Sequence, residues 1–194
     1  MSLDSHITDI KSVNIRSTNI KRRLLMSPIT VGNLTKYLQD HIGTEILIIN
    51  TNVGMEIYYC AKNDHSHFIK ETTLLHTMKP IDASKLRFKN SLTSEEVRKN
   101  FTETIITFAQ YPQLFLAYAK KFIHLRNNNS QSKYIMPALN SFFEDAMAFL
   151  AETGKVPHYD KIQRAKNKSQ KLDGNQKIIY NLISEILLKK HRKN

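Results

Sequence analysis

The residues best suited to metal or nucleophilic chemistry lie in one short stretch of the chain. Cys60, Asp64, His65, His67 and His76 are the densest polar group in the sequence. Thiolate and imidazole groups bind zinc, and two histidines two residues apart on a strand would point to the same side. The stretch lacks the closely spaced Cys or His pairs of recognised zinc frameworks. We therefore expect no metal ion here, and surface positions for the histidines.

A Cys60 nucleophile assisted by His65 or His67 is the enzymatic alternative. Such a site needs a histidine or a helix N-terminus that lowers the pKa of the thiol, and a third group that orients the histidine. The sequence around Cys60 indicates a strand, in which an alternating cysteine would enter the core. Neither a glycine-rich phosphate loop nor a dinucleotide fingerprint is present. The sequence favours a non-enzymatic protein without a cofactor, and leaves these three residues as weak catalytic candidates.

The stronger candidate site is the basic C-terminal part of the chain. The protein carries a net charge of +12, and residues 151–194 hold 11 Lys or Arg against 4 Asp or Glu. A field of this sign attracts nucleic acid, anionic lipid or an acidic protein. Within a predicted helix over residues 160–172 the basic residues recur every three or four positions, as Lys161, Arg164, Lys168 and Lys171, with Lys166 and Lys177 flanking them.

Such a stripe could contact consecutive phosphates, which dominate non-specific affinity for nucleic acid. The following helix, over residues 178–187, has a broad apolar face and few side chains for reading base edges. Recognition of the nucleic-acid backbone is thus expected rather than recognition of sequence. The alternative is a solvated basic face, since a composition rich in Lys and Asn can reflect genome base bias alone.

These residues need elements that position them, and the first half of the chain predicts a small α/β region. Residues 1–28 show no clear period and are expected to form an arm. Apolar spacing indicates a helix that ends at Gly43, and residues 45–49 and 55–61 indicate two strands joined by a turn. His67 to Ile69 could add a third strand, and residues 80–89 a connector or a fourth.

The second half predicts helices. Thr93 and Glu96 form a capping box, Pro112 suits the first turn of a second helix, and a third begins near Lys133. Together with the two predicted helices of the basic C-terminal part, over residues 160–172 and 178–187, the bundle has about five helices. The expected fold class is therefore α+β and mainly helical. A two- or three-stranded antiparallel meander with one helix precedes the bundle, in one globular domain over residues 29–194 that divides into 29–90 and 91–194.

Composition limits the compartment and the partners. A single cysteine forbids an intrachain disulfide and suits a reducing, cytoplasmic compartment, although delivery into another cell is compatible with the same features. No stretch approaches the roughly 18 apolar residues of a membrane-spanning helix. The first hypothesis is a binding module whose basic hairpin engages an acidic partner, with nucleic acid favoured. The alternatives are a protein-interaction adaptor or effector with a groove in residues 93–150, electrostatic contact with anionic membrane, and an enzyme at Cys60.

Overall fold

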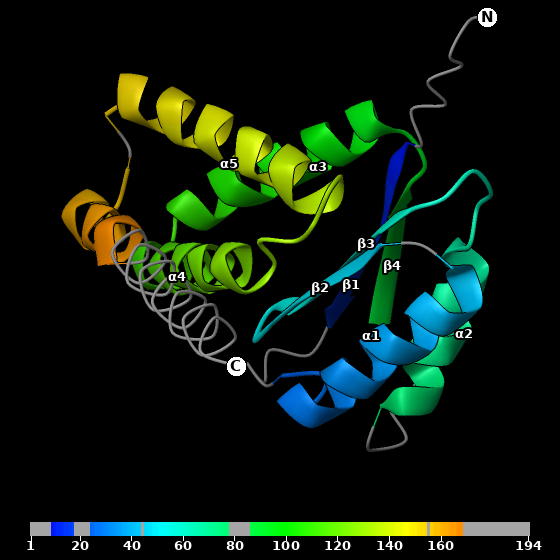
Figure 1. Ribbon diagram of the computed structural model, residues 1–194. Helices are drawn as coiled ribbons and strands as arrows, with labels where there is room; N and C mark the ends of the chain where they lie inside the picture. Colours follow the sequence, from blue (N-terminus) through cyan, green and yellow to red (C-terminus); the bar gives the residue numbers. More distant parts are fainter. Residues whose placement is uncertain (1–8, 18–23, 44, 78–85, 155, 169–194) are drawn as a thin grey trace, which may run out of the picture.

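The computed structural model describes residues 9–17, 24–43, 45–77, 86–154 and 156–168. Strands and helices are mixed in the first half of the chain, and the second half is helical (Figure 1). In chain order the elements are β1 (Ile10–Ser17), α1 (Pro28–Ile42), β2 (Ile46–Thr51), β3 (Gly54–Cys60), α2 (Ser66–His76), β4 (Leu86–Ser91), α3 (Ser94–Ala109), α4 (Pro112–Asn128), α5 (Ile135–Glu152) and a helix over 159–168.

The four strands form one antiparallel sheet in the order β2-β3-β1-β4. The first strand lies in its centre, where Val13 pairs with Ile57 of β3 and Asn90 of β4. This order and the βαββαβ succession are those of a ferredoxin-like split βαβ unit. Gly54 begins β3 at φ 152°, and a Cβ there would lie 2.2 Å from the carbonyl oxygen of Ile15. Only glycine therefore lets β1 approach the β2–β3 hairpin so closely.

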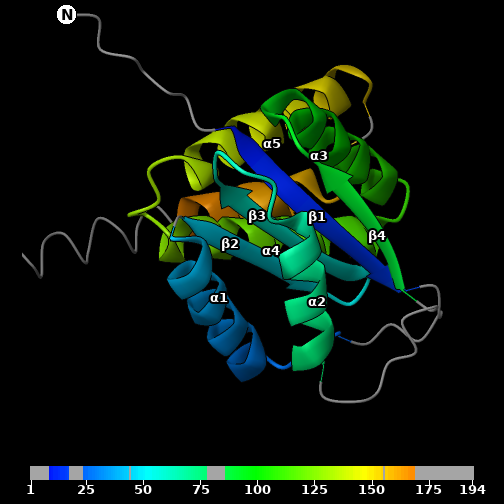
Figure 2. The same ribbon diagram turned by 90° about the vertical axis from the view of Figure 1, so that its right-hand side faces the viewer.

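Helices cover both faces of the sheet (Figures 1 and 2), so the molecule has three layers. Alternation along the strands assigns side chains to the two faces. Helices α1 and α2 cover one apolar cluster, which includes Val13, Ile57 and Tyr59 from the sheet. Helices α3, α4 and α5 cover the other, which includes Tyr58 and Cys60. Since β3 is buried along its whole length, it reads as a nearly continuous apolar run.

The helix boundaries follow the capping residues of the sequence. The Oγ1 of Thr93 accepts a hydrogen bond from the Glu96 amide at 3.2 Å, and the Glu96 carboxylate accepts one from the Leu92 amide at 2.7 Å. The capping box is thus confirmed, with the carboxylate reaching one residue beyond the N-cap. Gly43 caps α1 in the left-handed conformation (φ 71°), and Pro112 opens α4, both as predicted.

The α+β, mainly helical fold class is confirmed, but three expectations for the first half are wrong. Within the expected arm 1–28, residues 10–17 form the central strand β1, and Pro28 is the first residue of helix α1. The sheet accordingly has four strands, and it is not a meander because β1 separates β3 from β4. The period of β1 is hidden because only Val13 and Ile15 mark its apolar face, while Lys11 is polar on that face and Ile10 is apolar on the other.

His67 to Ile69, the expected third strand, instead lie in α2. The Asp64 carboxylate accepts hydrogen bonds from the amide (2.8 Å) and hydroxyl (3.1 Å) of Ser66, and so supports the first turn of that helix. In the second half, the helix predicted over 178–187 and the turn before it lie outside the described residues. Of the helices that are described, none is both long and apolar enough to cross a membrane.

Candidate functional site

Cys60 and the nearby histidines lie on opposite faces of the sheet. Cys60 is 4% exposed in the α3–α5 core, and burial, reinforced by the Glu45 carboxylate, raises its thiol pKa to about 12. Its neighbour Tyr59 points to the α2 side, where its hydroxyl donates to Asp64 (3.1 Å) and accepts from the His65 amide (3.4 Å). The alternation of one strand thus separates the thiol from the histidine expected to activate it.

The remaining histidines are engaged along their own helix. The His67 ring is 85% exposed and lies 3.5 Å from the Glu71 carboxylate, one helical turn away. The Nδ1 of His76 lies 2.9 Å from the Thr72 carbonyl oxygen. Among the described residues, no three His, Cys, Asp or Glu side chains come close enough together to hold a metal ion. The polar cluster of the sequence is therefore not a cluster in space.

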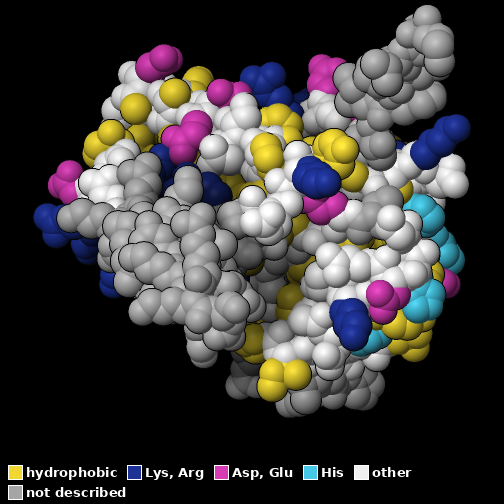
Figure 3. All heavy atoms as spheres, viewed as in Figure 1, with side chains coloured by type: hydrophobic (Ala, Val, Ile, Leu, Met, Phe, Trp, Pro, Cys, Tyr) yellow, Lys and Arg dark blue, Asp and Glu magenta, His cyan; other side chains and the backbone are white. Residues whose placement is uncertain are grey.

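Helix 159–168 presents three of the predicted basic residues to solvent. We call Lys161, Arg164 and Lys168 the cationic row, since all three are exposed and recur at spacings of three and four. The opposite side of the helix anchors it, because Ile162 is fully buried in the α3–α5 core and Ala165 packs against that core. Dark blue side chains gather at the left edge of Figure 3, where Figure 1 places this helix.

Lys166, predicted to flank the stripe, is engaged inside the protein. Its ammonium donates to both carboxylate oxygens of Glu144 at 2.7 and 2.6 Å and lies 5.6 Å from the ring centroid of Phe143. Its side chain is only 13% exposed. The residue therefore ties helix 159–168 to α5 instead of facing a partner. Lys171 and Lys177, the other two predicted residues, lie outside the described part of the chain.

A shallow hollow of about 340 Å³ lies at the start of the same helix. Its rim includes Tyr159, which is 50% exposed, and Asp160. The backbone turns sharply at His158 (φ 54°), whose buried Nε2 has no hydrogen-bond partner. Lys161 and Arg164 of the cationic row line the hollow as well. The arrangement places an exposed aromatic ring and an imidazole beside two positive charges.

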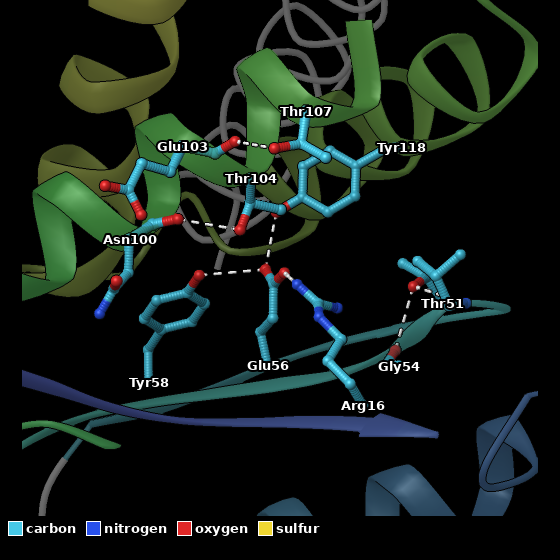
Figure 4. Close-up of polar contacts among 11 residues, drawn as sticks. Arg16, Thr51, Gly54, Glu56, Tyr58, Asn100, Glu103, Thr104, Thr107 and Tyr118 are labelled. Atoms are coloured by element: carbon cyan, nitrogen blue, oxygen red, sulfur yellow. Dashed lines mark hydrogen bonds and ion pairs between the residues drawn. The ribbon is translucent and has the colours of Figure 1, made fainter. Parts of the chain in front are cut away.

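A second polar site, which sequence reasoning missed, lies between the sheet and the helices. Glu56 of β3 is 2% exposed, and its carboxylate accepts hydrogen bonds from Tyr58 (3.0 Å), Tyr118 of α4 (2.7 Å) and Arg16 of β1 (2.6 Å) (Figure 4). We call these four residues the Glu56 cluster. Burial, and then the Glu56 charge, raises the pKa of both tyrosines well above 10.0, so the two hydroxyls remain donors.

The Glu56 cluster joins three elements through one carboxylate. Tyr58 lies on β3 together with Glu56, Arg16 lies on β1, and Tyr118 lies on α4. Such a buried, fully bonded carboxylate has its charge compensated and has no exposed face for a substrate. The sequence signal is a single acid within the apolar run from Met55 to Tyr59, where strand burial demands a partner.

Next to the Glu56 cluster, a pocket of about 250 Å³ opens between β1, β4 and α3. We call it the β1–α3 pocket. Figure 4 shows the α3 side chains that overhang it, above the strands that form its floor. Its lining comes from three separate segments of the chain, and although all of these residues but Phe108 are polar, mostly their carbon atoms face the pocket: Asn14, Arg16, Lys89, Asn100, Glu103, Thr104, Thr107 and Phe108.

Comparison with known proteins does not supply a function. No family model matches the chain, and a search of curated proteins finds no match. The ferredoxin-like connection of the sheet occurs with many unrelated activities, so it carries no functional assignment by itself. The choice between sites therefore depends on their geometry and charge.

Proposed function

We propose that the protein binds nucleic acid through its backbone phosphates, using the cationic row of helix 159–168. The observation that carries the proposal is the contrast between this row and Lys166 on the same helix. Lys166 has a carboxylate partner, whereas Lys161, Arg164 and Lys168 are exposed and have no acidic partner among the described residues. Cations without internal partners are free to exchange counterions for phosphates.

The spacing of the row suits a polynucleotide. Seven residues separate its ends, which corresponds to about 10 Å along a helix axis, or roughly three nucleotide steps of one strand. Tyr159 lines the same hollow as Lys161 and Arg164 and is half exposed, so a base could stack on its ring while the phosphates meet the cations. Duplex DNA keeps its bases stacked inside, and this ring therefore favours a single strand.

The test measures binding of a fluorescently labelled single-stranded oligonucleotide by anisotropy across a series of salt concentrations. Reversing the charge at Lys161, Arg164 and Lys168 to Glu is expected to abolish measurable binding. Replacing the same three residues by Gln should reduce the slope of log K against log salt by about 2, since each phosphate contact on a single strand contributes roughly 0.7. Tyr159→Ala should weaken binding of the single strand more than binding of a duplex of equal length.

A matched control separates the row from net charge. Lys36, Lys62 and Lys99 are exposed residues of α1, the loop after β3, and α3. Reversing these three to Glu changes the net charge equally and should leave most of the binding intact. Circular dichroism must show that both triple variants fold. The proposal is wrong if the wild type does not bind at low salt, or if the control loses as much affinity as the row variant.

The alternative prediction, a protein partner at residues 93–150, has weaker support. The large apolar side chains exposed in that region are Tyr111, Tyr134 and Phe149. They belong to the start of α4, the residue before α5 and the last turns of α5, respectively. Single exposed aromatics at helix ends are ordinary, whereas a docking groove requires a continuous apolar patch.

A further inference from the structure

The hollow at the start of helix 159–168 contains an acidic residue that phosphate binding does not explain. Asp160 lines it together with Lys161 and Arg164. A carboxylate repels the phosphates that these two cations attract, so a surface built for phosphates alone gains nothing from an acid at this place. Asp160 is exposed, and none of the described residues donates a hydrogen bond to its carboxylate or forms an ion pair with it. Its acceptor oxygens are therefore available to a ligand.

The position of Asp160 relative to Arg164 makes this free carboxylate more informative. The two residues lie four positions apart on one helix with the acid first, which is the preferred arrangement for an ion pair along a helix. Both residues are described, and neither a hydrogen bond nor an ion pair joins them, although both line the hollow. An acceptor and a donor thus remain unpaired on one surface, which suits a ligand that presents both kinds of group.

The size and the lining of the hollow suit one nucleotide unit. Its volume of about 340 Å³ lies at the lower end of the range of roughly 300–1,000 Å³ for small-molecule sites. Polar and carbon atoms face it in about equal measure, and its lining includes the half-exposed ring of Tyr159. In a nucleotide the sugar joins the base to the phosphate. A base on Tyr159 and a phosphate at Lys161 or Arg164 therefore leave the sugar in the hollow, beside Asp160.

The sugar of a strand offers a carboxylate a hydrogen-bond donor only in RNA. Within a DNA strand the 3′ and 5′ oxygens are esterified, whereas ribose keeps its 2′-hydroxyl, which is both a donor and an acceptor. An ionised carboxylate is an acceptor only, and it forms stronger hydrogen bonds than a neutral oxygen does. In dinucleotide-binding sites an Asp or Glu accepts from a ribose hydroxyl in the same way. Asp160 thus gains a hydrogen bond from RNA, whereas DNA brings it only phosphate repulsion.

From these observations we infer that the hollow selects single-stranded RNA over single-stranded DNA. The Asp160 carboxylate accepts a hydrogen bond from one ribose 2′-hydroxyl, while the base lies on Tyr159. The inference rests on the proposed function, because the cationic row must first hold the backbone of the strand. It adds a choice of sugar to a surface that otherwise recognises charge and stacking.

The first experiment compares three labelled oligonucleotides of equal length by fluorescence anisotropy: oligouridylate, oligodeoxyuridylate and 2′-O-methyl oligouridylate. All three have the same base and the same charge. The RNA should bind the full-length protein about fivefold to tenfold more tightly than the DNA, which is the effect of one hydrogen bond. The 2′-O-methyl strand keeps the 2′ oxygen but lacks its proton, and it should bind no more tightly than the DNA.

The second experiment separates the acceptor of Asp160 from its charge. Asp160→Asn and Asp160→Ala both remove the negative charge, so both should bind DNA more tightly than the wild type does. Asparagine keeps an acceptor oxygen and should keep part of the preference for RNA, whereas the alanine variant should bind the two strands about equally.

A measurement of Tm tests whether Asp160 acts only on the helix. Asp160 is the second residue of helix 159–168, where a negative charge also complements the helix dipole. A merely structural role would lower Tm in both variants and leave the ratio of RNA to DNA affinity unchanged, and that result would overturn the inference. Glu95→Ala is the matched control, because Glu95 is an exposed acid in the first turn of α3. This variant should keep the ratio of the wild type.

Three further outcomes would also overturn the inference. Equal affinity of the wild type for RNA and DNA would exclude a choice of sugar, while leaving the proposed function intact. A 2′-O-methyl strand that binds as tightly as RNA would assign the preference to the conformation of the sugar instead of a donated proton. A preference that survives Asp160→Ala would place the contact elsewhere. Absence of binding by all three strands at low salt is a different result, because it rejects the proposed function itself.

Discussion

The two faces of the sheet are closed in different ways. On the α1–α2 face, the sheet contributes apolar residues such as Val13, Ile15 and Ile57, all of them fully buried. Polar contacts on that face lie at its margins, as where Lys11 Nζ donates to the Ala61 carbonyl and the Tyr59 hydroxyl donates to Asp64. On the α3–α5 face, the same strands hold the ion pair of the partly buried Arg16 with the buried Glu56, which also accepts hydrogen bonds from two tyrosine hydroxyls, one of them from α4.

The difference shows where geometry must be fixed most tightly. Apolar contacts are non-directional and tolerate repacking at constant volume. Hydrogen bonds to a buried carboxylate are directional, and they are satisfied only when α4 holds Tyr118 at one place above β3. We therefore expect the Glu56 cluster to set how the helical layer sits on the sheet, and the α1–α2 face to supply non-specific stability. The following predictions test this division, in order of expected effect.

Glu56→Gln should have the largest effect on stability. It preserves the size of the side chain but leaves the partly buried Arg16 charge without its counter-charge, which costs about 3 kcal/mol in the free energy of unfolding. Denaturant unfolding followed by circular dichroism measures this loss. The double variant Arg16→Met, Glu56→Gln should recover most of it, and a double variant as unstable as the sum of the single changes would contradict the role of the pair.

Alkaline pH should act on the α3–α5 face through Cys60. The folded thiol has a pKa of about 12, above its ordinary value of 9.0. Between these values the unfolded chain loses the proton and the folded protein keeps it, so the free energy of unfolding is unaffected below pH 9 and falls as pH rises toward 12. Over that range the wild type should lose about 1.4 kcal/mol per pH unit more than Cys60→Ala. Tyr58 and Tyr118 add a further loss above pH 10 in both proteins. Equal slopes would show that the thiol is accessible in the folded state.

Ile57→Val tests the other face with the next residue of the same strand. Removing one methylene from this fully buried side chain should cost about 1 kcal/mol, clearly less than Glu56→Gln. Near-ultraviolet circular dichroism should be unchanged, because apolar neighbours can relax into the space. A loss larger than that of Glu56→Gln would reverse the proposed division between the faces.

Arg98→Gln should have the smallest effect. Arg98 and Asp145 form an ion pair between α3 and α5 at 3.0 Å, with side chains 60% and 51% exposed. Water and salt screen such a pair, and its removal should cost less than about 1 kcal/mol, and less again at high salt. An effect comparable to Glu56→Gln would mean that charge pairing matters in this protein irrespective of burial.

The sequence predicted those features that depend on neighbouring residues. Thr93 with Glu96, Gly43 and Pro112 marked helix ends because capping is local. Strand β1 was missed because its apolar alternation is confined to Val13 and Ile15: Ile10 lies on the opposite face, and Lys11 occupies the face of Val13. Lys161 is exposed, as expected for a member of the basic stripe that the helical spacing predicted.

The contacts that join residues far apart in the chain could not be predicted from sequence pattern. Lys166 was predicted to flank the basic stripe, but it meets Glu144, which lies 22 residues earlier. Arg16 and Glu56 are 40 residues apart, and Glu56 and Tyr118 are 62 apart. Only the order of the strands brings Asn14, Lys89 and α3 around one pocket.

The central position of β1 has a consequence for synthesis on the ribosome. Val13 pairs with Ile57 and Asn90, so its two partner strands emerge 44 and 77 residues after it. At about 5 to 20 residues per second the strand waits for several seconds without either neighbour. During that time β1 is a nascent segment that chaperones can bind, and a chain lacking it exposes the edges of β3 and β4 to aggregation. β1 can pair with β3 first, and the four-stranded sheet is complete only after β4 has left the ribosome.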